Sequence, residues 1–246
     1  MKEHQNLFRD LQEDFRKMKK NLLVAQSGGP TAAINATLAG VIKQAIKEEQ
    51  IDQVYGACYG IQGVLEQKFV NLTEKVDTEE KLEKLKRTPA AALGSCRFKL
   101  NDIKEDDSQY QEIVDILHKM NIGYFVYIGG NDSMDTVGKM SRYVKEHQMD
   151  VKVIGIPKTI DNDLWGTDMT FGFQSAVNVA TDAIDCIHTT AASHGRVFIV
   201  ELMGHKVGWL TLHAGIAGGA DIILLPEMPY NFDAVVMAVK QRNKAG

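Results

Sequence analysis

The chain of 246 residues is long enough for one large domain or two modest domains with a sizeable hydrophobic core. Its formal net charge of −4 provides no basic excess that would attract nucleic acid. The three cysteines, Cys58, Cys96 and Cys186, lack the spacing of a zinc site, no apolar run approaches the roughly 18 residues of a membrane span, and the N-terminus is too polar for a signal peptide. We therefore expect a cytoplasmic protein with free thiols that binds neither membranes nor nucleic acid.

The first 21 residues contain the first predicted element. Leu7, Leu11, Phe15 and Met18 recur at helical spacing among charged residues. We expect an amphipathic helical extension, which either pads a domain or subunit contact or binds a specific partner.

From residue 22 onward, apolar strands alternate with helices. Strands are predicted at 22–26, 53–59, 124–128, 151–156, 196–202 and 222–225. Helices are predicted at 31–49, 78–87, 109–120, 133–147, 173–190 and 209–217, followed by a last helix that ends near Lys244. This alternation predicts an α/β fold with doubly wound, mostly parallel sheets, in which ligands bind at the carboxyl ends of the strands.

Two of these strands end in glycine pairs followed by helices, SGGPT (27–31) and GGNDS (129–133). Glycine lets the backbone approach a ligand closely, and a helix N-terminus favours negative charge, so both turns suit phosphate. Asp132 would repel a further anion unless a cation intervenes. The alternative is that the first segment is only a tight turn and that Asp132 or Ser133 only caps a helix.

A third strand ends in PKTIDND (157–163). An aspartate beside a lysine can stay ionised and take a proton from a hydroxyl group, the lysine can neutralise a transferring phosphoryl group, and a second aspartate can hold hydrated magnesium. The alternative is a charged loop with an internal salt bridge. The P-loop and dinucleotide-binding motifs are absent from the sequence, so neither of those nucleotide sites is indicated.

Seven segments complete the pattern from residue 25 onward: AQSGGPTAAINATLAGVI (25–42), LGSCRF (93–98), GGNDSMDT (129–136), GIPKTIDNDL (155–164), TFGFQSA (170–176), SHGRV (193–197) and MGHKVGWLTLHAGIAGGADIILLPE (203–227). In this order they resemble the phosphofructokinase family, specifically its pyrophosphate-dependent branch. The resemblance covers nearly all of the chain from residue 22 onward, and it is specific as a set rather than in any single segment.

The resemblance implies a two-domain architecture. Residues 22–171 would form a large donor-binding α/β domain and residues 172–246 part of a smaller α/β domain that binds sugar phosphate. The family continues beyond the point where this chain stops, so we expect a C-terminally incomplete version of its fold. The implied reaction is Mg²⁺-assisted, reversible phosphoryl transfer from pyrophosphate to the 1-hydroxyl of fructose 6-phosphate, a glycolytic step, in a homo-oligomer that is a dimer or a tetramer.

The resemblance also implies roles for individual residues. Asp161 would be the general base, and the other catalytic residues would be Lys158, Asp132 and Thr159. Donor binding falls to Gly28, Gly29, Arg97, Gly130, Asp132 and Ser133. Sugar phosphate binding falls to Thr159, Asp161, Asp163, Arg196, Met203, Gly204 and His205, with Arg196 reaching a neighbouring subunit's substrate. Asn131 and Asp163 would bind the magnesium ion.

Three positions decide how closely the family pattern applies. ATP users of the family usually have glycine where this chain has Asp132, whose carboxylate occupies the space of the nucleotide α-phosphate; this favours pyrophosphate over an ATP-dependent 6-phosphofructokinase. Asn131 stands where many members have a magnesium-binding Asp. His205 replaces the usual Arg and can be neutral near pH 7.

A second class of function stays open beside the enzyme. The expected incompleteness of the chain favours this second class, either a non-catalytic fragment or a subunit that partners a complete chain. The full set of Asp132, Lys158 and Asp161 favours the enzyme.

Overall fold

The structure, a computed structural model, describes residues 19–245. The helix predicted within residues 1–21 falls almost entirely outside these residues. The chain divides into two compact units, Met1–Pro157 and Lys158–Gly246. This division falls earlier in the chain than the predicted domain boundary near residue 171. The predicted boundary between the donor-binding domain and the sugar phosphate domain stays a prediction.

The first unit is built around a parallel sheet. The strands are β1 (Lys20–Gln26), β2 (Ile51–Ala57), β3 (Phe69–Asn71), β4 (Ile122–Gly129), β5 (Lys152–Thr159) and β6 (Phe171–Gly172), in the order β3-β2-β1-β4-β5-β6. All neighbouring pairs are parallel except β2 and β3. β5 runs across the division between the units. Its last two residues, Lys158 and Thr159, pair with β6, and these residues and β6 belong to the second unit.

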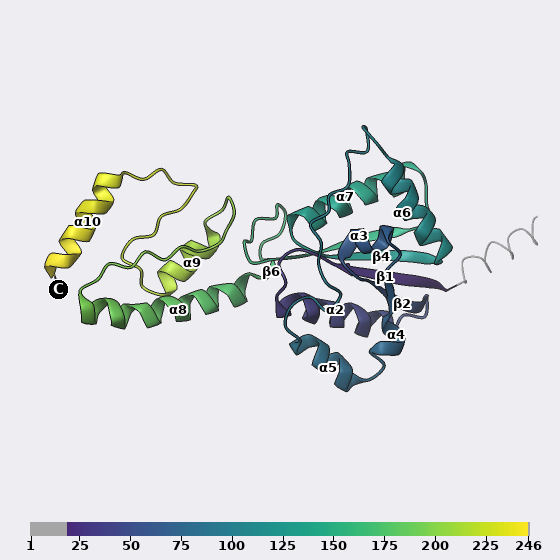
Figure 1. The fold of residues 1–246 in the computed structure, drawn as a ribbon, viewed down its shortest axis with the longest axis horizontal. Helices are drawn as coiled ribbons and strands as arrows, with labels where there is room; N and C mark the ends of the chain where they lie inside the picture. The colour runs from purple at the N-terminus through teal and green to yellow at the C-terminus, as the bar shows by residue number, and fades with distance from the viewer. Residues whose placement is uncertain (1–18, 246) are drawn as a thin grey trace, which may run out of the picture. The chain divides into compact units, whose positions relative to one another are not determined.

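Helices cover both faces of this sheet. They are α2 (Ala32–Ala45), α3 (Gly60–Leu65), α4 (Leu72–Lys75), α5 (Glu79–Arg87), α6 (Ser108–Lys119) and α7 (Asn131–Glu146). Figure 1 shows α2 and α5 on one side of the sheet and α6 and α7 on the other. Alternate residues of β1 enter the two cores: Leu23 and Ala25 join one, and Leu22 and Val24 the other. The predicted doubly wound, mostly parallel α/β fold is confirmed.

Two buried amides attach the segment after α5 to the sheet. Gln26 and Asn35 are both fully buried. The Asn35 amide donates to the carbonyls of Thr88 (2.8 Å) and Ala90 (2.7 Å), and its oxygen accepts from the backbone N–H of Ala92 (2.9 Å). The Gln26 side chain donates to Asn35 Oδ1 (3.1 Å). Because these groups satisfy one another away from water, they hold residues 88–92 in one conformation.

The second unit contains three helices, α8 (Phe173–His194), α9 (Trp209–Ala217) and α10 (Phe232–Ala245). Small apolar clusters join α8 to α9, one with Phe173, Val177 and Leu210, the other with Ala180, Ile184 and Ala214. Of the helices in residues 19–245, none combines the length and apolar character needed to cross a bilayer.

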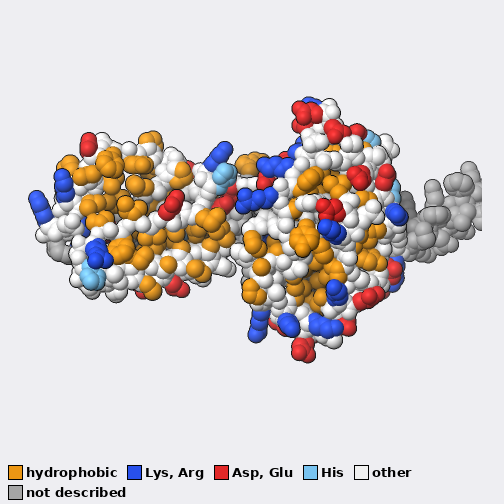
Figure 2. Space-filling model, viewed as in Figure 1, with side chains coloured by type: hydrophobic (Ala, Val, Ile, Leu, Met, Phe, Trp, Pro, Cys, Tyr) orange, Lys and Arg blue, Asp and Glu red, His pale blue; other side chains and the backbone are white. Residues whose placement is uncertain are grey.

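The strands predicted at 196–202 and 222–225 are wrong, because both segments are irregular in the structure. A strand needs a neighbour to receive its backbone hydrogen bonds, and neither segment has a paired strand among residues 19–245. Val197, Phe198, Ile199 and Val200 are all exposed, Ile199 to 94%. Figure 2 shows hydrophobic side chains spread over the visible face of this unit. Apolar β-forming composition was therefore insufficient to make these strands.

We expect Asn35→Leu to lower the free energy of unfolding by roughly 2–4 kcal/mol, because it removes the hydrogen bonds of the fully buried Asn35 amide to the Thr88 and Ala90 carbonyls and from the Ala92 N–H. Urea unfolding followed by far-UV circular dichroism would measure this. The control is Gln44→Ala, an exposed position of the same helix, which should change stability by less than about 0.5 kcal/mol. Equal stability of Asn35→Leu and the unaltered protein would contradict the structural role given to the amides.

Candidate functional site

The two glycine turns of the first unit lie side by side. β1 and β4 are paired in register up to Gln26 and Ile128, so the turns that follow them leave the same edge of the sheet. Gly28 has a φ of +86°, and a Cβ there would lie 3.2 Å from the backbone nitrogen of Gly130. A Cβ on Gly129 would lie 2.6 Å from the Ser27 carbonyl oxygen. The close approach of the turns therefore depends on glycine at both positions.

Each turn leads into the N-terminus of a helix. The N-cap residues are Thr31 for α2 and Gly130 for α7, and neither forms a side-chain capping hydrogen bond within the described chain. The alternative in which Asp132 or Ser133 caps α7 is therefore not what the structure has. Thr31 Oγ1 is buried without a hydrogen-bond partner among the described residues. Two adjacent helix N-termini with glycine turns make a positively polarised backbone surface suited to phosphate.

A third segment, residues 93–99, is hydrogen-bonded to the first glycine turn. Ser27 Oγ donates to the Cys96 carbonyl (2.8 Å), and Ser95 Oγ donates to the Gly28 carbonyl (2.9 Å). Arg97, predicted to bind the donor, is exposed on this segment. The same segment carries Lys99, whose Nζ lies 2.9 Å from Asp132 Oδ1.

The structure thus brings together the predicted donor residues Gly28, Gly130 and Asp132, and it attaches the segment that carries Arg97 to them. Sequence reasoning missed Lys99 and the buried Thr31 hydroxyl. The signal for Lys99 was a second basic residue two positions after Arg97. No signal in the sequence pairs Lys99 with Asp132, because the two residues lie 33 positions apart in the chain.

The second unit holds the other predicted cluster, in the loop that follows β5. The Asp161 N–H donates to Thr159 Oγ1 (3.2 Å), and Thr170 Oγ1 donates to the Thr159 carbonyl (2.7 Å). Asn162 has a φ of +55°, and its side-chain oxygen accepts from the Thr170 N–H (2.8 Å). The buried Thr170 therefore fixes the turn that presents Asp161 and Asp163.

Burial and charge perturb the titration of this loop. Lys158 is only 2% exposed, and its burial lowers its pKa, although the Asp161 charge acts in the opposite direction. Burial raises the pKa of Asp161, and the nearby Asp163 carboxylate raises it further, while His205 and Lys158 lower it. Asp161 Oδ1 is also buried with no hydrogen-bond partner among residues 19–245. A carboxyl group whose pKa is raised in this way accepts a proton more readily than an ordinary Asp, as a general base must.

The predicted sugar phosphate residues fall into two groups within the second unit. His205 lies close enough to Asp161 to affect its pKa, and Gly204 beside it is buried where a Cβ would lie 2.3 Å from the Val207 carbonyl oxygen. Met203 is exposed. Arg196 instead follows the far end of α8, whose 22 residues span about 33 Å from the end that adjoins β6. The structure therefore brings His205 to Asp161 but not Arg196.

Magnesium is compatible with the residues present. Among residues 19–245, no three His, Cys, Asp or Glu side chains gather closely enough to form a metal site by themselves. Magnesium does not require such a set, because it is usually held by one or two carboxylates with waters and substrate phosphates. The Asp163 carboxylate disfavours the charged form of the adjoining Asp161, so a cation there would be favourable.

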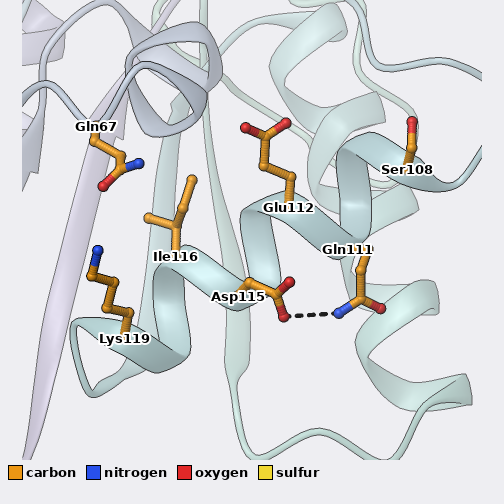
Figure 3. A pocket seen from close by; sticks show the side chains of 7 residues that line it. All are labelled: Gln67, Ser108, Gln111, Glu112, Asp115, Ile116 and Lys119. Carbon is orange, nitrogen blue, oxygen red and sulfur yellow. Dashed lines mark hydrogen bonds between the residues drawn. The ribbon is translucent and has the colours of Figure 1, made fainter.

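Two surface pockets lie apart from these residues. The pocket in Figure 3 has a volume of about 410 Å³ and is lined by Gln67 and by residues at and along α6, among which Gln111 donates to Asp115 (2.8 Å). A second, of about 520 Å³, lies along α8 and α9. None of the predicted site residues lines either pocket.

We expect Gly28→Ala to weaken pyrophosphate binding by roughly ten-fold or more, since a Cβ is strained by about 1–2 kcal/mol at this φ and pushes the two turns apart. Isothermal titration calorimetry on the full chain measures the affinity. The control, Gly138→Ala in α7, meets nothing within 4 Å and should bind normally while gaining about 0.5–1 kcal/mol of stability. Unchanged binding by Gly28→Ala would contradict the idea that the turns form the donor surface.

Comparison with known proteins gives the chain its family. The family model described as phosphofructokinase matches residues 21–246. The ATP-dependent 6-phosphofructokinase 3 of Bacteroides thetaiotaomicron is 41% identical over 226 residues, which are 91% of this chain and 64% of that protein. The pyrophosphate--fructose 6-phosphate 1-phosphotransferase of Xanthomonas campestris pv. campestris is 42% identical over 231 residues, 90% of this chain and 54% of that protein.

The fold agrees with this assignment. The crystal structure of a pyrophosphate-dependent phosphofructokinase from Nitrosospira multiformis superposes with a TM-score of 0.82 at 33% identity, over 92% of this chain and 58% of that one. The chain thus spans about 60% of the length of the curated relatives it matches. On the match of the family model over residues 21–246, the chain belongs to the phosphofructokinase family.

Proposed function

We propose that this chain binds pyrophosphate and transfers a phosphoryl group from it to the 1-hydroxyl of fructose 6-phosphate, giving fructose 1,6-bisphosphate. The observation that carries the proposal is the pair of glycine turns at adjacent strand ends, with Asp132 in the first turn of α7. Family membership supports the reaction, and relatives named for this activity include users of ATP and of pyrophosphate. The names alone therefore leave the donor open.

Asp132 is our reason for choosing pyrophosphate. Its carboxylate stands at the entrance to the anion-binding N-terminus of α7, where family members that use ATP usually have glycine. A carboxylate there takes up the space that the α-phosphate of a nucleotide would need, whereas pyrophosphate has no group to place there. ATP is the second candidate donor, favoured by the name of the Bacteroides relative.

The residues after β5 would handle the acceptor. Asp161 accepts the proton of the 1-hydroxyl group of the sugar. At the same time, the oxygen of that hydroxyl group forms the new bond to phosphorus and the bond to the leaving phosphate breaks. Lys158 neutralises charge on the phosphoryl group, since an anion beside it favours its charged form. Thr159 and the segment from Met203 to His205 would complete the set of residues that bind fructose 6-phosphate. The predicted Mg²⁺ ligands are Asn131 in the first unit and Asp163 in the second. Bound Mg²⁺ would neutralise phosphate charge.

Arg196 fits a role in a neighbouring subunit. The length of α8 separates it from the loop of Asp161 within its own unit, so it would not serve the same substrate as Asp161 of its own chain. We propose that it contacts the sugar phosphate of a neighbouring copy in a homo-oligomer.

A coupled assay of fructose 1,6-bisphosphate formation, with pyrophosphate or ATP and Mg²⁺, tests the proposal when combined with calorimetry of donor binding. Turnover with pyrophosphate supports it. Turnover with ATP alone would overturn the donor assignment. Pyrophosphate binding without turnover would favour a non-catalytic donor-binding chain or partner subunit, and the absence of both binding and turnover would refute the function.

The pH dependence of turnover should reveal Asp161. Because its pKa is raised and the base must be ionised to act, the rate should rise with pH through a value above that of an ordinary Asp. Asp161→Ser should slow turnover by roughly 10²–10⁴-fold, remove this acid limb and leave pyrophosphate affinity nearly unchanged. The control is Asp168→Ser. Near-normal turnover of Asp161→Ser would exclude Asp161 as the base.

Asp132→Gly should shift donor preference toward ATP. This substitution opens space for the nucleotide and removes a negative charge. We therefore expect the ratio of kcat/KM for ATP to that for pyrophosphate to rise by roughly 10- to 100-fold. Asp135→Gly is the matched control, since it places the same change three positions further along α7. If Asp132→Gly still excludes ATP, another residue blocks the nucleotide.

A further inference from the structure

The negative charge of Asp132, which forms an ion pair with Lys99, is unfavourable for a donor at the two glycine turns. Asp132 is acidic in the first turn of α7, where its negative charge competes with any anion for the positive end of the helix. A carboxylate that repels the phosphates of a nucleotide should also repel pyrophosphate, which carries several negative charges in a small volume. Exclusion of one donor and acceptance of the other therefore needs a compensating cation.

Lys99 is placed to be that cation. Its Nζ lies 2.9 Å from Asp132 Oδ1, and both side chains are exposed, to 70% and 64%. Asp132 and, more weakly, Asp135 raise the pKa of Lys99, so its ammonium stays charged. Asp135 has a nearer partner of its own in Lys139, at 3.0 Å. The charge of Lys99 is therefore directed mainly at Asp132.

The position of Lys99 is fixed by the backbone rather than by the ion pair. Its segment is attached to the first glycine turn through Ser27 and Ser95 and to the core through Leu93, whose N–H donates to Gln26 Oε1 (2.9 Å). Exposed ion pairs contribute little to folding, so the pair has little structural purpose.

We propose that Lys99 is a donor-specificity residue that cancels the charge of Asp132, so that Asp132 excludes a nucleotide by its bulk while pyrophosphate is still attracted. The inference rests on the proposed function and deepens it. Lys99 acts through Asp132 as a positioning residue, and its effect belongs to donor binding rather than to the chemical step. The proposal also predicts that the effect of Lys99 on pyrophosphate binding depends on whether residue 132 carries a negative charge.

The experiment is a double-mutant cycle on the full chain, with inorganic pyrophosphate as the probe in calorimetry. Lys99→Gln should weaken pyrophosphate binding by about 5- to 20-fold. Lys99→Arg should retain binding. In the Asp132→Asn background, Lys99→Gln should have a clearly smaller effect, because no carboxylate is left to compensate. The matched control is Lys104→Gln, which removes the same charge from an exposed lysine that forms no ion pair within the described residues.

Two results would overturn the inference: unchanged pyrophosphate affinity of Lys99→Gln, or an equal loss in both backgrounds, which would mean that Lys99 acts without Asp132. Where the protein turns over, Lys99→Gln should raise KM for pyrophosphate and leave kcat nearly unchanged, and a fall in kcat alone would also overturn it. If pyrophosphate binds and follows the cycle but no fructose 1,6-bisphosphate forms, the proposed function fails and the role of Lys99 stands. If the unaltered chain does not bind pyrophosphate, both fail.

Discussion

The parallel pairing of β1 with β4 is the constraint on which the rest of the first unit depends. It carries two chain segments to one edge of the sheet in register, and there the backbones approach so closely that Gly28 and Gly129 have no room for a side chain. Each glycine turn leads directly into a helix, so α2 and α7 both begin at this edge of the sheet. Such a backbone surface suits phosphate. In the proposed function, the side chains beside it would discriminate between donors.

Neighbouring elements build on that edge. The buried Gln26 and Asn35 amides hold residues 88–92, and the segment that follows brings Arg97 and Lys99 to the glycine turns. A buried polar network thus helps to fix where two exposed cations lie. In the proposed function, the first unit would combine an anion-binding backbone with the Asp132 carboxylate and the facing Lys99 ammonium, and donor choice would depend on their local charge balance.

The second unit has a different physical character. Its chemistry is concentrated in the loop after β5, where burial disfavours the charges of Lys158 and Asp161 and their mutual attraction partly restores them. Its remaining length is three helices with small apolar clusters and much exposed hydrophobic surface. The segment at 197–200 has the composition of a buried strand but lies exposed, so its sequence and its surroundings disagree within this unit.

The sequence by itself determined the alternation of elements, the two-sided burial of β1 and the strand ends that carry the candidate chemistry, because apolar periodicity and glycine–helix junctions are local signals. Tertiary structure alone decided the rest. The pairing of Lys99 with Asp132 and the approach of His205 to Asp161 join residues distant in the chain, and no local pattern encodes such contacts. For segments 196–202 and 222–225, local composition predicted strands that the structure does not have. Strand composition is local, but a strand exists only where a second strand accepts its hydrogen bonds.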